Sequence, residues 1–154
     1  MGRSRREATP AQRALALLVR REHSRPELTR KLLARGIEPA QAAAAVAQMS
    51  EAGWQDDLRF ACSLVRARTS GGQGPVRIRA ELASHGLDSD VIRAAFEALS
   101  QAGEDDWVAR AHELAMRRFG PDLESLPVRR KASHFLLRRG FDGDTVRRAV
   151  HGPV

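Results

Sequence analysis

Three stretches of the chain share one spacing of residues, and this spacing constrains the fold more than any other feature. The stretches "LLARGIEPAQAAAAV" (32–46), "LASHGLDSDVIRAAF" (82–96) and "LLRRGFDGDTVRRAV" (136–150) align on a glycine. In each of them a leucine stands four residues before the glycine, a large apolar residue follows the glycine, and an acid comes next. Another apolar residue stands ten residues after each glycine. The pattern predicts that one structural unit occurs three times.

Each glycine is predicted to end one helix and to start the turn into the next. A glycine at this position takes the left-handed backbone conformation, in which a residue with a side chain would be sterically strained. The apolar residue behind it folds back on the leucine, as in a Schellman motif. The acid is expected to cap the following helix and to face the positive end of its dipole. The glycines are Gly36, Gly86 and Gly140, and the acids are Glu38, Asp88 and Asp142.

The repeating unit contains three helices, because a second helix end recurs after the first two turns. "SEAG" (50–53) and "SQAG" (100–103) both end in glycine, and Asp56 and Asp106 then stand at predicted helix starts. The sequence therefore predicts an all-α fold, a tandem array of three three-helix repeats that is elongated and curved. The expected divisions are a basic N-terminal arm at 1–9 and repeats at 10–53, 54–103 and 104–154, the last helix being truncated. The expected helices span 10–23, 26–35, 39–52, 57–69, 75–85, 89–102, 106–119, 128–139 and 143–150.

The composition agrees with a helical protein of the cytoplasm. Alanine and leucine supply most of the apolar residues, and tyrosine is absent. The single cysteine, Cys62, excludes an intramolecular disulfide and fits a reducing compartment. No apolar run reaches the ~20 residues that span a membrane, and the basic N-terminus lacks a signal-peptide pattern. Cys62 is predicted to fill the core, and Trp54 and Trp107 to pack between helices.

The motifs that could carry chemistry have simpler explanations. "SGGQGP" (70–75) lacks the Lys-Ser/Thr pair of a phosphate-binding P-loop and follows a predicted helix, so we interpret it as a connecting loop. The acids in "QDD" (55–57) and "EDDW" (104–107) stand where helices begin, and the five histidines show no metal-ligand spacing. We expect no catalytic residue, no metal and no cofactor. An Asp-dependent metal enzyme is the alternative that these acids leave open.

Positive charge gathers at the two ends of the chain. The net charge is +7, of which residues 1–13 carry +3 and residues 110–154 carry +5. Nearly all basic residues are arginines, which bind phosphate and carboxylate groups through paired hydrogen bonds. A polyanion or an acidic protein groove is therefore the expected partner, although solvated helix faces would also explain the charge. The candidate contact residues are Arg77, Arg79, Arg129, Arg130, Lys131, Arg138, Arg139, Arg147 and Arg148.

Two linked motifs stand in one register, "SEAGWQDDLRFA" (50–61) and "GPVRIRAELASHGL" (74–87). Together they resemble the signature of the RecX family of bacterial regulators of RecA, and the likeness extends from about Ala14 to Val150. Gln55 departs from the family pattern, which commonly has an aliphatic residue there, and the third repeat is weak around 119–127. The matching residues are Gly53, Asp56, Asp57, Phe60, Ala61, Gly74, Pro75, Arg77, Ile78, Glu81, Leu82 and Gly86.

The resemblance implies tandem three-helix repeats and a regulator without catalysis. RecX-like proteins bind the RecA nucleoprotein filament along its groove and inhibit strand exchange and ATP hydrolysis. We expect the same partner here, with weak binding to single- and double-stranded DNA that has no sequence preference, and no membrane or small-molecule substrate. The alternative is a basic helical module that acts on DNA without RecA. Its candidate recognition helices are rich in alanine and lack the side chains that read base edges.

Overall fold

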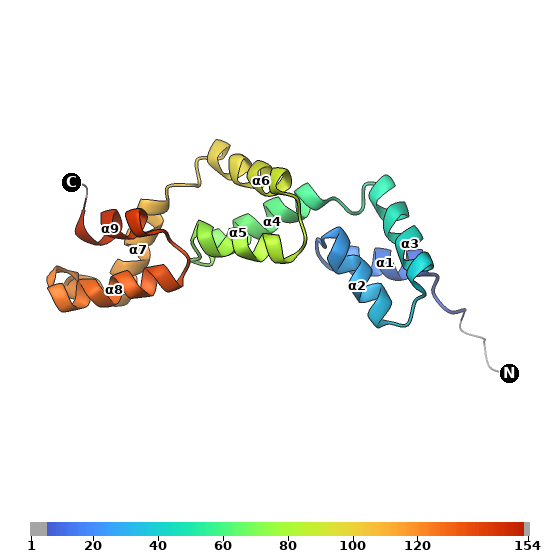
Figure 1. The fold of residues 1–154 in the computed structure, drawn as a ribbon, viewed down its shortest axis with the longest axis horizontal. Helices are drawn as coiled ribbons and strands as arrows, with labels where there is room; N and C mark the ends of the chain where they lie inside the picture. The colour runs from blue at the N-terminus through green and yellow to red at the C-terminus, as the bar shows by residue number, and fades with distance from the viewer. Residues whose placement is uncertain (1–5, 153–154) are drawn as a thin grey trace.

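The computed structural model describes residues 6–152, and these residues form an all-helical chain without a strand (Figure 1). The predicted fold class is confirmed. The basic arm predicted at 1–9 lies partly outside the described residues. The helices are α1 (Pro10–Arg20), α2 (Arg25–Ala34), α3 (Pro39–Glu51), α4 (Asp57–Ser70), α5 (Pro75–Ser84), α6 (Ser89–Gln101), α7 (Trp107–Phe119), the 3-10 helix η1 (Gly120–Glu124), α8 (Leu126–Arg138) and α9 (Gly143–His151).

Every helix starts within two residues of its predicted position, and the differences have local causes. Helix α1 ends at Arg20 instead of residue 23, because Arg21 turns into extended backbone and its guanidinium binds Glu27 of α2. The break predicted at 119–127 contains η1, which buries Leu123 in the core. Helix α8 begins two residues early because the Ser125 hydroxyl accepts the backbone N–H of Val128.

The helix caps confirm part of the sequence prediction. Asp56, Asp106 and Asp142 accept backbone N–H groups at 2.8 to 3.0 Å, as the capping argument requires. Glu38 and Asp88 make no side-chain capping hydrogen bond, so the predicted capping by these two acids is wrong. Both side chains are exposed, and glutamate is a poor capping residue in any case.

The three glycines have the predicted left-handed conformation, and the turns at Gly36 and Gly140 also have the Schellman hydrogen bond. Gly36, Gly86 and Gly140 take φ values of +81°, +74° and +97°. The N–H of Ile37 donates to the carbonyl oxygen of Leu32 at 3.3 Å, and the N–H of Phe141 donates to its counterpart Leu136 at 3.2 Å. The turn therefore reverses the chain the same way in the first and third units.

Each set of three helices encloses its own apolar core. The three clusters are centred on Leu28 and Leu32 in α1–α3, on Ile78 and Leu82 in α4–α6, and on Leu136 in α7–α9. The three sets follow one another along the long axis, with α1–α3 and α7–α9 at opposite ends (Figure 1). The residue boundaries that we assign to the repeats stay a prediction.

One tryptophan prediction holds and the other fails. Trp107 packs against both the α4–α6 and the α7–α9 cores, as predicted. The Trp54 side chain is 50% exposed, so its predicted packing between helices is wrong. The buried residue of this linker is Gln55, which is 4% exposed and finds polar partners there. Cys62 is half-buried against the α4–α6 core. Within residues 6–152 no helix combines the length and apolar character needed to span a bilayer.

Candidate interaction surface

The aspartates of the two acidic clusters cap helices. The carboxylates of Asp56 and Asp106 accept the N–H groups of Arg59 and Ala109, which is the role of a helix cap. Among residues 6–152, no three His, Cys, Asp or Glu side chains come together as a metal site would require. The surface features that remain are the arginines.

Two of the predicted arginines from different repeats meet at the joint between α4–α6 and α7–α9. The N–H of Gly74, at the start of α5, donates to the carbonyl oxygen of Arg139 at 2.8 Å, and the N–H of Val76 donates to Gly140 at 2.9 Å. This contact sets Arg77 against the α8–α9 turn, where its guanidinium lies 3.5 Å from the carbonyl oxygen of Arg138. We call Arg77 and Arg138 the joint arginine pair. Both side chains are exposed, so the pair offers two cations to an anionic partner.

A second pair of arginines stacks on one aromatic ring. The guanidinium carbon of Arg139 lies 5.3 Å from the ring centre of Phe135, and that of Arg118 lies 4.8 Å from it. A cation over an aromatic face is held electrostatically while its N–H groups stay free to bind anions. Sequence reasoning misses Arg118, because the contact depends on how α7 packs against α8. The adjacent basic residues Arg117 and Arg118 at the end of α7 were the available signal.

The remaining predicted residues do not join one continuous patch. Arg79 stacks on Phe96 of α6, with 4.0 Å between its guanidinium carbon and the ring centre. Arg129 donates to the carbonyl oxygen of Leu123, and Arg147 is paired with Asp144. Arg130 and Lys131 are exposed on α8, and Arg148 lines a groove of about 490 Å³ between α7 and α9. The predicted contact function of all nine residues stays a prediction.

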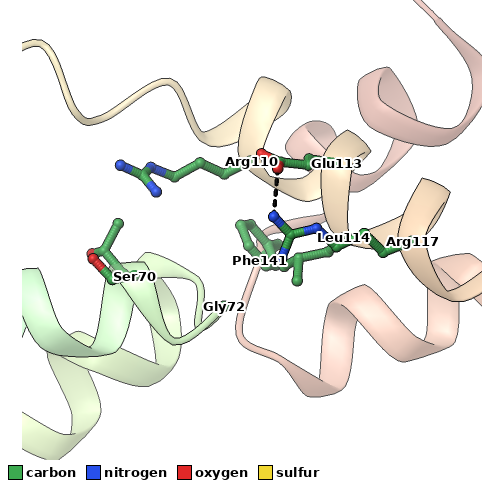
Figure 2. A pocket seen from close by; sticks show the side chains of 8 residues that line it. Ser70, Gly72, Arg110, Glu113, Leu114, Arg117 and Phe141 are labelled. Atoms are coloured by element: carbon green, nitrogen blue, oxygen red, sulfur yellow. Dashed lines mark hydrogen bonds and ion pairs between the residues drawn. The ribbon is translucent and has the colours of Figure 1, made fainter.

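A small cavity lies in the same joint (Figure 2). Its volume is about 90 Å³, which is room for a few water molecules and too little for a nucleotide. The Arg110 side chain reaches over Ser70 from α7, and the Arg117 guanidinium pairs with Glu113 at 2.6 Å. The wall beside α4 is formed by Gly72, whose φ of +87° is the turn of the loop predicted at 70–75. The residues that line the cavity are Thr69, Ser70, Gly72, Arg110, Glu113, Leu114, Arg117 and Phe141.

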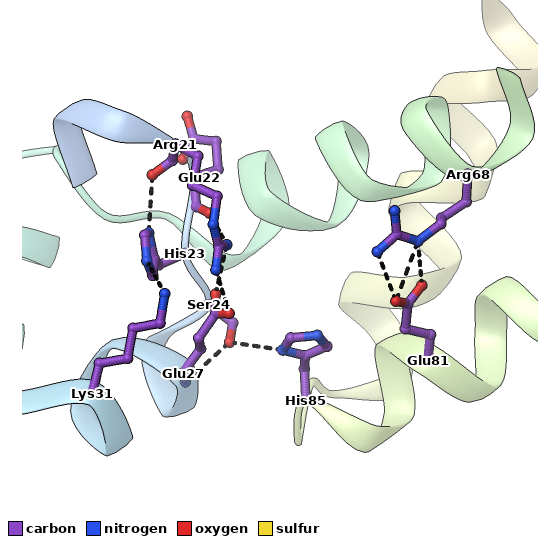
Figure 3. A network of polar contacts seen from close by, with 9 residues as sticks. All are labelled: Arg21, Glu22, His23, Ser24, Glu27, Lys31, Arg68, Glu81 and His85. Atoms are coloured by element: carbon purple, nitrogen blue, oxygen red, sulfur yellow. Dashed lines mark hydrogen bonds and ion pairs between the residues drawn. The ribbon is translucent and has the colours of Figure 1, made fainter. Parts of the chain in front are cut away.

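The joint between α1–α3 and α4–α6 is polar (Figure 3). The Ser24 hydroxyl lies 3.3 Å from Nδ1 of His85, across the joint. The Gln55 side-chain amide donates to the carbonyl oxygen of His23 at 3.3 Å and to Asp57 at 2.9 Å. Gln55 stands where the motif commonly has an aliphatic residue. In this chain its amide links the two sets of helices through hydrogen bonds.

The buried histidine of this joint is held in its neutral form. His23 is 1% exposed, with Nδ1 3.0 Å from the carbonyl oxygen of Arg21 and Nε2 3.0 Å from the Lys31 ammonium group. Nε2 therefore accepts from Lys31, and Nδ1 carries the proton. Burial lowers the pKa of His23 below 6.5, and the charges of Arg21 and Lys31 add to this effect, against the opposing backbone hydrogen bond and Glu27.

This histidine should make the stability of the chain depend on pH. Because the folded pKa of His23 is lowered, its contribution is complete above the unfolded value of 6.5 and is lost as the pH falls through the folded value. The urea midpoint should therefore fall between about pH 7 and about pH 5, and His23→Gln should flatten this slope. Glu27 does not act in this window: burial raises its pKa, but Arg21 outweighs burial and keeps it below 4.5. An unchanged slope in the His23→Gln variant would contradict the assignment.

Comparison with protein-family models accounts for the three sets of helices in order. Residues 12–49 match the first three-helix domain of RecX, residues 56–95 match the second, and residues 104–150 match the third. The chain belongs to the RecX family. The resemblance inferred from the two sequence motifs is thereby confirmed, including for the third unit.

Relatives in the family cover nearly the whole chain. The protein named Regulatory protein RecX of Stenotrophomonas maltophilia strain R551-3 is 60% identical over 152 residues, which is 97% of this chain and 91% of the relative. The protein of the same name from Xanthomonas axonopodis pv. citri strain 306 is 57% identical over 150 residues, 97% of this chain and 90% of the relative.

Solved structures of the family share the fold. The crystal structure of RecX from Lactobacillus salivarius superposes with a TM-score of 0.75 at 21% identity, covering 92% of each chain. A second structure, of a regulatory protein RecX, also has a TM-score of 0.75, at 19% identity, and covers 94% of this chain and 70% of that one. At these identities the likeness concerns the arrangement of the helices alone.

Proposed function

We propose that this chain is a non-catalytic regulator that binds the RecA–DNA filament and inhibits its recombinase and ATPase activities. The observation that carries the proposal is family membership over residues 12–150, together with relatives that are named regulatory proteins. The partner and the inhibition come from the family resemblance. DNA repair, recombination and the SOS response are the processes in which such a regulator would act, and the cytoplasm is the compartment that holds its partner.

The elongated array fits a partner with repeating subunits. Three sets of helices in a row present contacts along the length of the molecule, which suits a filament better than a closed pocket would. The joint arginine pair can bind carboxylates of an acidic protein surface or phosphates of DNA. Inhibition then needs binding alone, either by blocking filament growth or by favouring a filament state that turns over slowly.

The ATPase activity of RecA on single-stranded DNA tests this proposal directly. The chain is titrated into the reaction at much less than one copy per RecA subunit. We expect strong inhibition in this range, because one bound array can block the growth of a filament that contains many subunits. The same titration repeated with EDTA-treated protein and with Asp56→Asn should give the same curve. A dependence on metal or on Asp56 would favour the metal enzyme instead.

A basic module that acts on DNA without RecA is the second candidate, favoured only by the positive charge of the chain. It predicts that inhibition begins only when the DNA itself is saturated, and that it weakens steeply with salt. If the chain inhibits RecA only at concentrations that saturate the DNA with it, this second candidate would replace the first proposal.

A further inference from the structure

The two joints of the array use equivalent positions with different chemistry. Ser24 and Gly74 both precede the second helix of a repeat, and His85 and Arg139 both stand just before the glycine of the turn that follows. At the first joint the Ser24 hydroxyl meets the His85 imidazole. At the second joint the Gly74 N–H meets the Arg139 backbone carbonyl. The same contact is thus made by side chains in one place and by backbone in the other.

The second joint has no room for rearrangement. A Cβ atom on Gly74 would lie 2.4 Å from the carbonyl carbon and oxygen of Gly140, and one on Gly140 would lie 2.3 Å from Cβ of Arg77. Trp107 belongs to both neighbouring cores, with ring centres 6.3 Å from Phe96 and 6.5 Å from Phe141. Close backbone contact and shared apolar packing both fix a single geometry.

The first joint lacks both of these features. The apolar clusters of α1–α3 and α4–α6 share no residue in the described part of the chain, where no backbone-to-backbone hydrogen bond joins 10–51 to 57–101. The contacts that cross this joint involve side chains. They include the Ser24–His85 hydrogen bond and the Glu22–Arg59 ion pair, in which the Glu22 side chain is 29% exposed and the Arg59 side chain 46% exposed. A partly exposed ion pair such as Glu22–Arg59 is exchanged for contacts with water at a small net free energy.

Linker length does not explain the contrast. Residues 52–56 connect α3 to α4, and residues 102–106 connect α6 to α7, so the two linkers are equally long. The first linker is held from both sides: Arg59 of α4 donates to the carbonyl oxygens of Gly53 and Trp54, and the N–H of Trp54 donates to the carbonyl oxygen of Met49 in α3. The difference in contacts across the joints therefore decides how freely each one moves.

We propose that the joint between α1–α3 and α4–α6 is a hinge, about which α1–α3 turns as a unit, while α4–α9 moves as one body. Polar interfaces between units of one chain permit such motion, whereas tight apolar ones suppress it. The hinge would let α1–α3 adapt to a partner surface while the joint arginine pair keeps its geometry on the other body.

Distance measurements by pulsed electron paramagnetic resonance on the full chain test the hinge. In a Cys62→Ala background, spin labels are placed on the exposed positions Ala43, Glu97 and His134 as the pairs Ala43→Cys/Glu97→Cys and Glu97→Cys/His134→Cys. The first pair spans the proposed hinge and the second spans the fixed joint. We expect the first distance distribution to be about twice as wide as the second. Equal widths, or a wider second distribution, would overturn the proposal.

A pair of side-chain truncations supplies the control. Ser24→Ala combined with His85→Ala removes the side-chain contact at the position that backbone occupies in the other joint. This variant should broaden or shift only the Ala43/Glu97 distribution. If the Glu97/His134 distance distribution broadens or shifts to the same extent, the two truncations disturb the whole fold. That result would contradict the proposal that they act on the hinge alone. The comparison of the two labelled pairs without these truncations decides the proposal by itself.

Discussion

Replacing Gly140 by alanine should lower the free energy of unfolding by about 3 kcal/mol. Two effects add in this variant. The φ of +97° is strained for any residue with a side chain, and the new methyl group would lie 2.3 Å from Cβ and 2.8 Å from the backbone nitrogen of Arg77. Neither group can move without opening the joint between α4–α6 and α7–α9. Urea denaturation followed by far-ultraviolet circular dichroism measures the loss.

The other glycines separate the two effects. Gly36 has a similar φ of +81°, but an added Cβ would meet no atom within 4 Å, so Gly36→Ala should cost only about 1 kcal/mol. Gly74 has an ordinary φ of −90° but faces Gly140 backbone at 2.4 Å, so Gly74→Ala isolates the crowding, at about 2 kcal/mol. Gly143→Ala, in open space at the start of α9, should be neutral or slightly stabilising. Equal losses at Gly36 and Gly140 would contradict the role of the joint.

Local signals predicted the helices well because each one depends on few neighbouring residues. Glycine after a leucine-containing helix and aspartate before the next one both act within a few residues of the boundary they define. The failures concern packing at longer range. The sequence cannot tell that Gln55 takes the buried place beside Trp54, because its partners His23 and Ser50 come from other segments.

The candidate surface shows the same limit. Sequence reasoning found Arg77 and Arg138 as separate basic residues, and only the docking of two glycines brings them into contact. It also counted Arg147 as a contact residue, whereas Asp144 one turn earlier neutralises part of its charge. Arg118 was overlooked because its partner ring belongs to a different helix. Charge density along the chain therefore indicates the region of an interaction surface, and packing decides its members.

Reversing the charge of Arg77, Lys131 and Arg138 to glutamate should weaken inhibition of RecA by about 100-fold, since each lost contact of this kind contributes about 1 kcal/mol. All three side chains are exposed, and Lys131 and Arg138 are seven residues apart, on the same side of α8. The helical circular dichroism should stay unchanged. The measurement is the concentration of the variant that halves the DNA-dependent ATPase activity of RecA.

The matched control carries the same change in net charge at the other end of the array. Arg20, Arg30 and Arg35 are also exposed, and their reversal to glutamate alters the total charge equally. If inhibition depends on general attraction to a polyanion, both triple variants lose it to the same extent, and the effect fades as salt is raised. If Arg77, Lys131 and Arg138 form a specific contact, only the first variant loses inhibition. That loss persists at salt concentrations high enough to screen general attraction to a polyanion. Full inhibition by the first variant would remove these three residues from the contact while leaving the assignment to the family untouched.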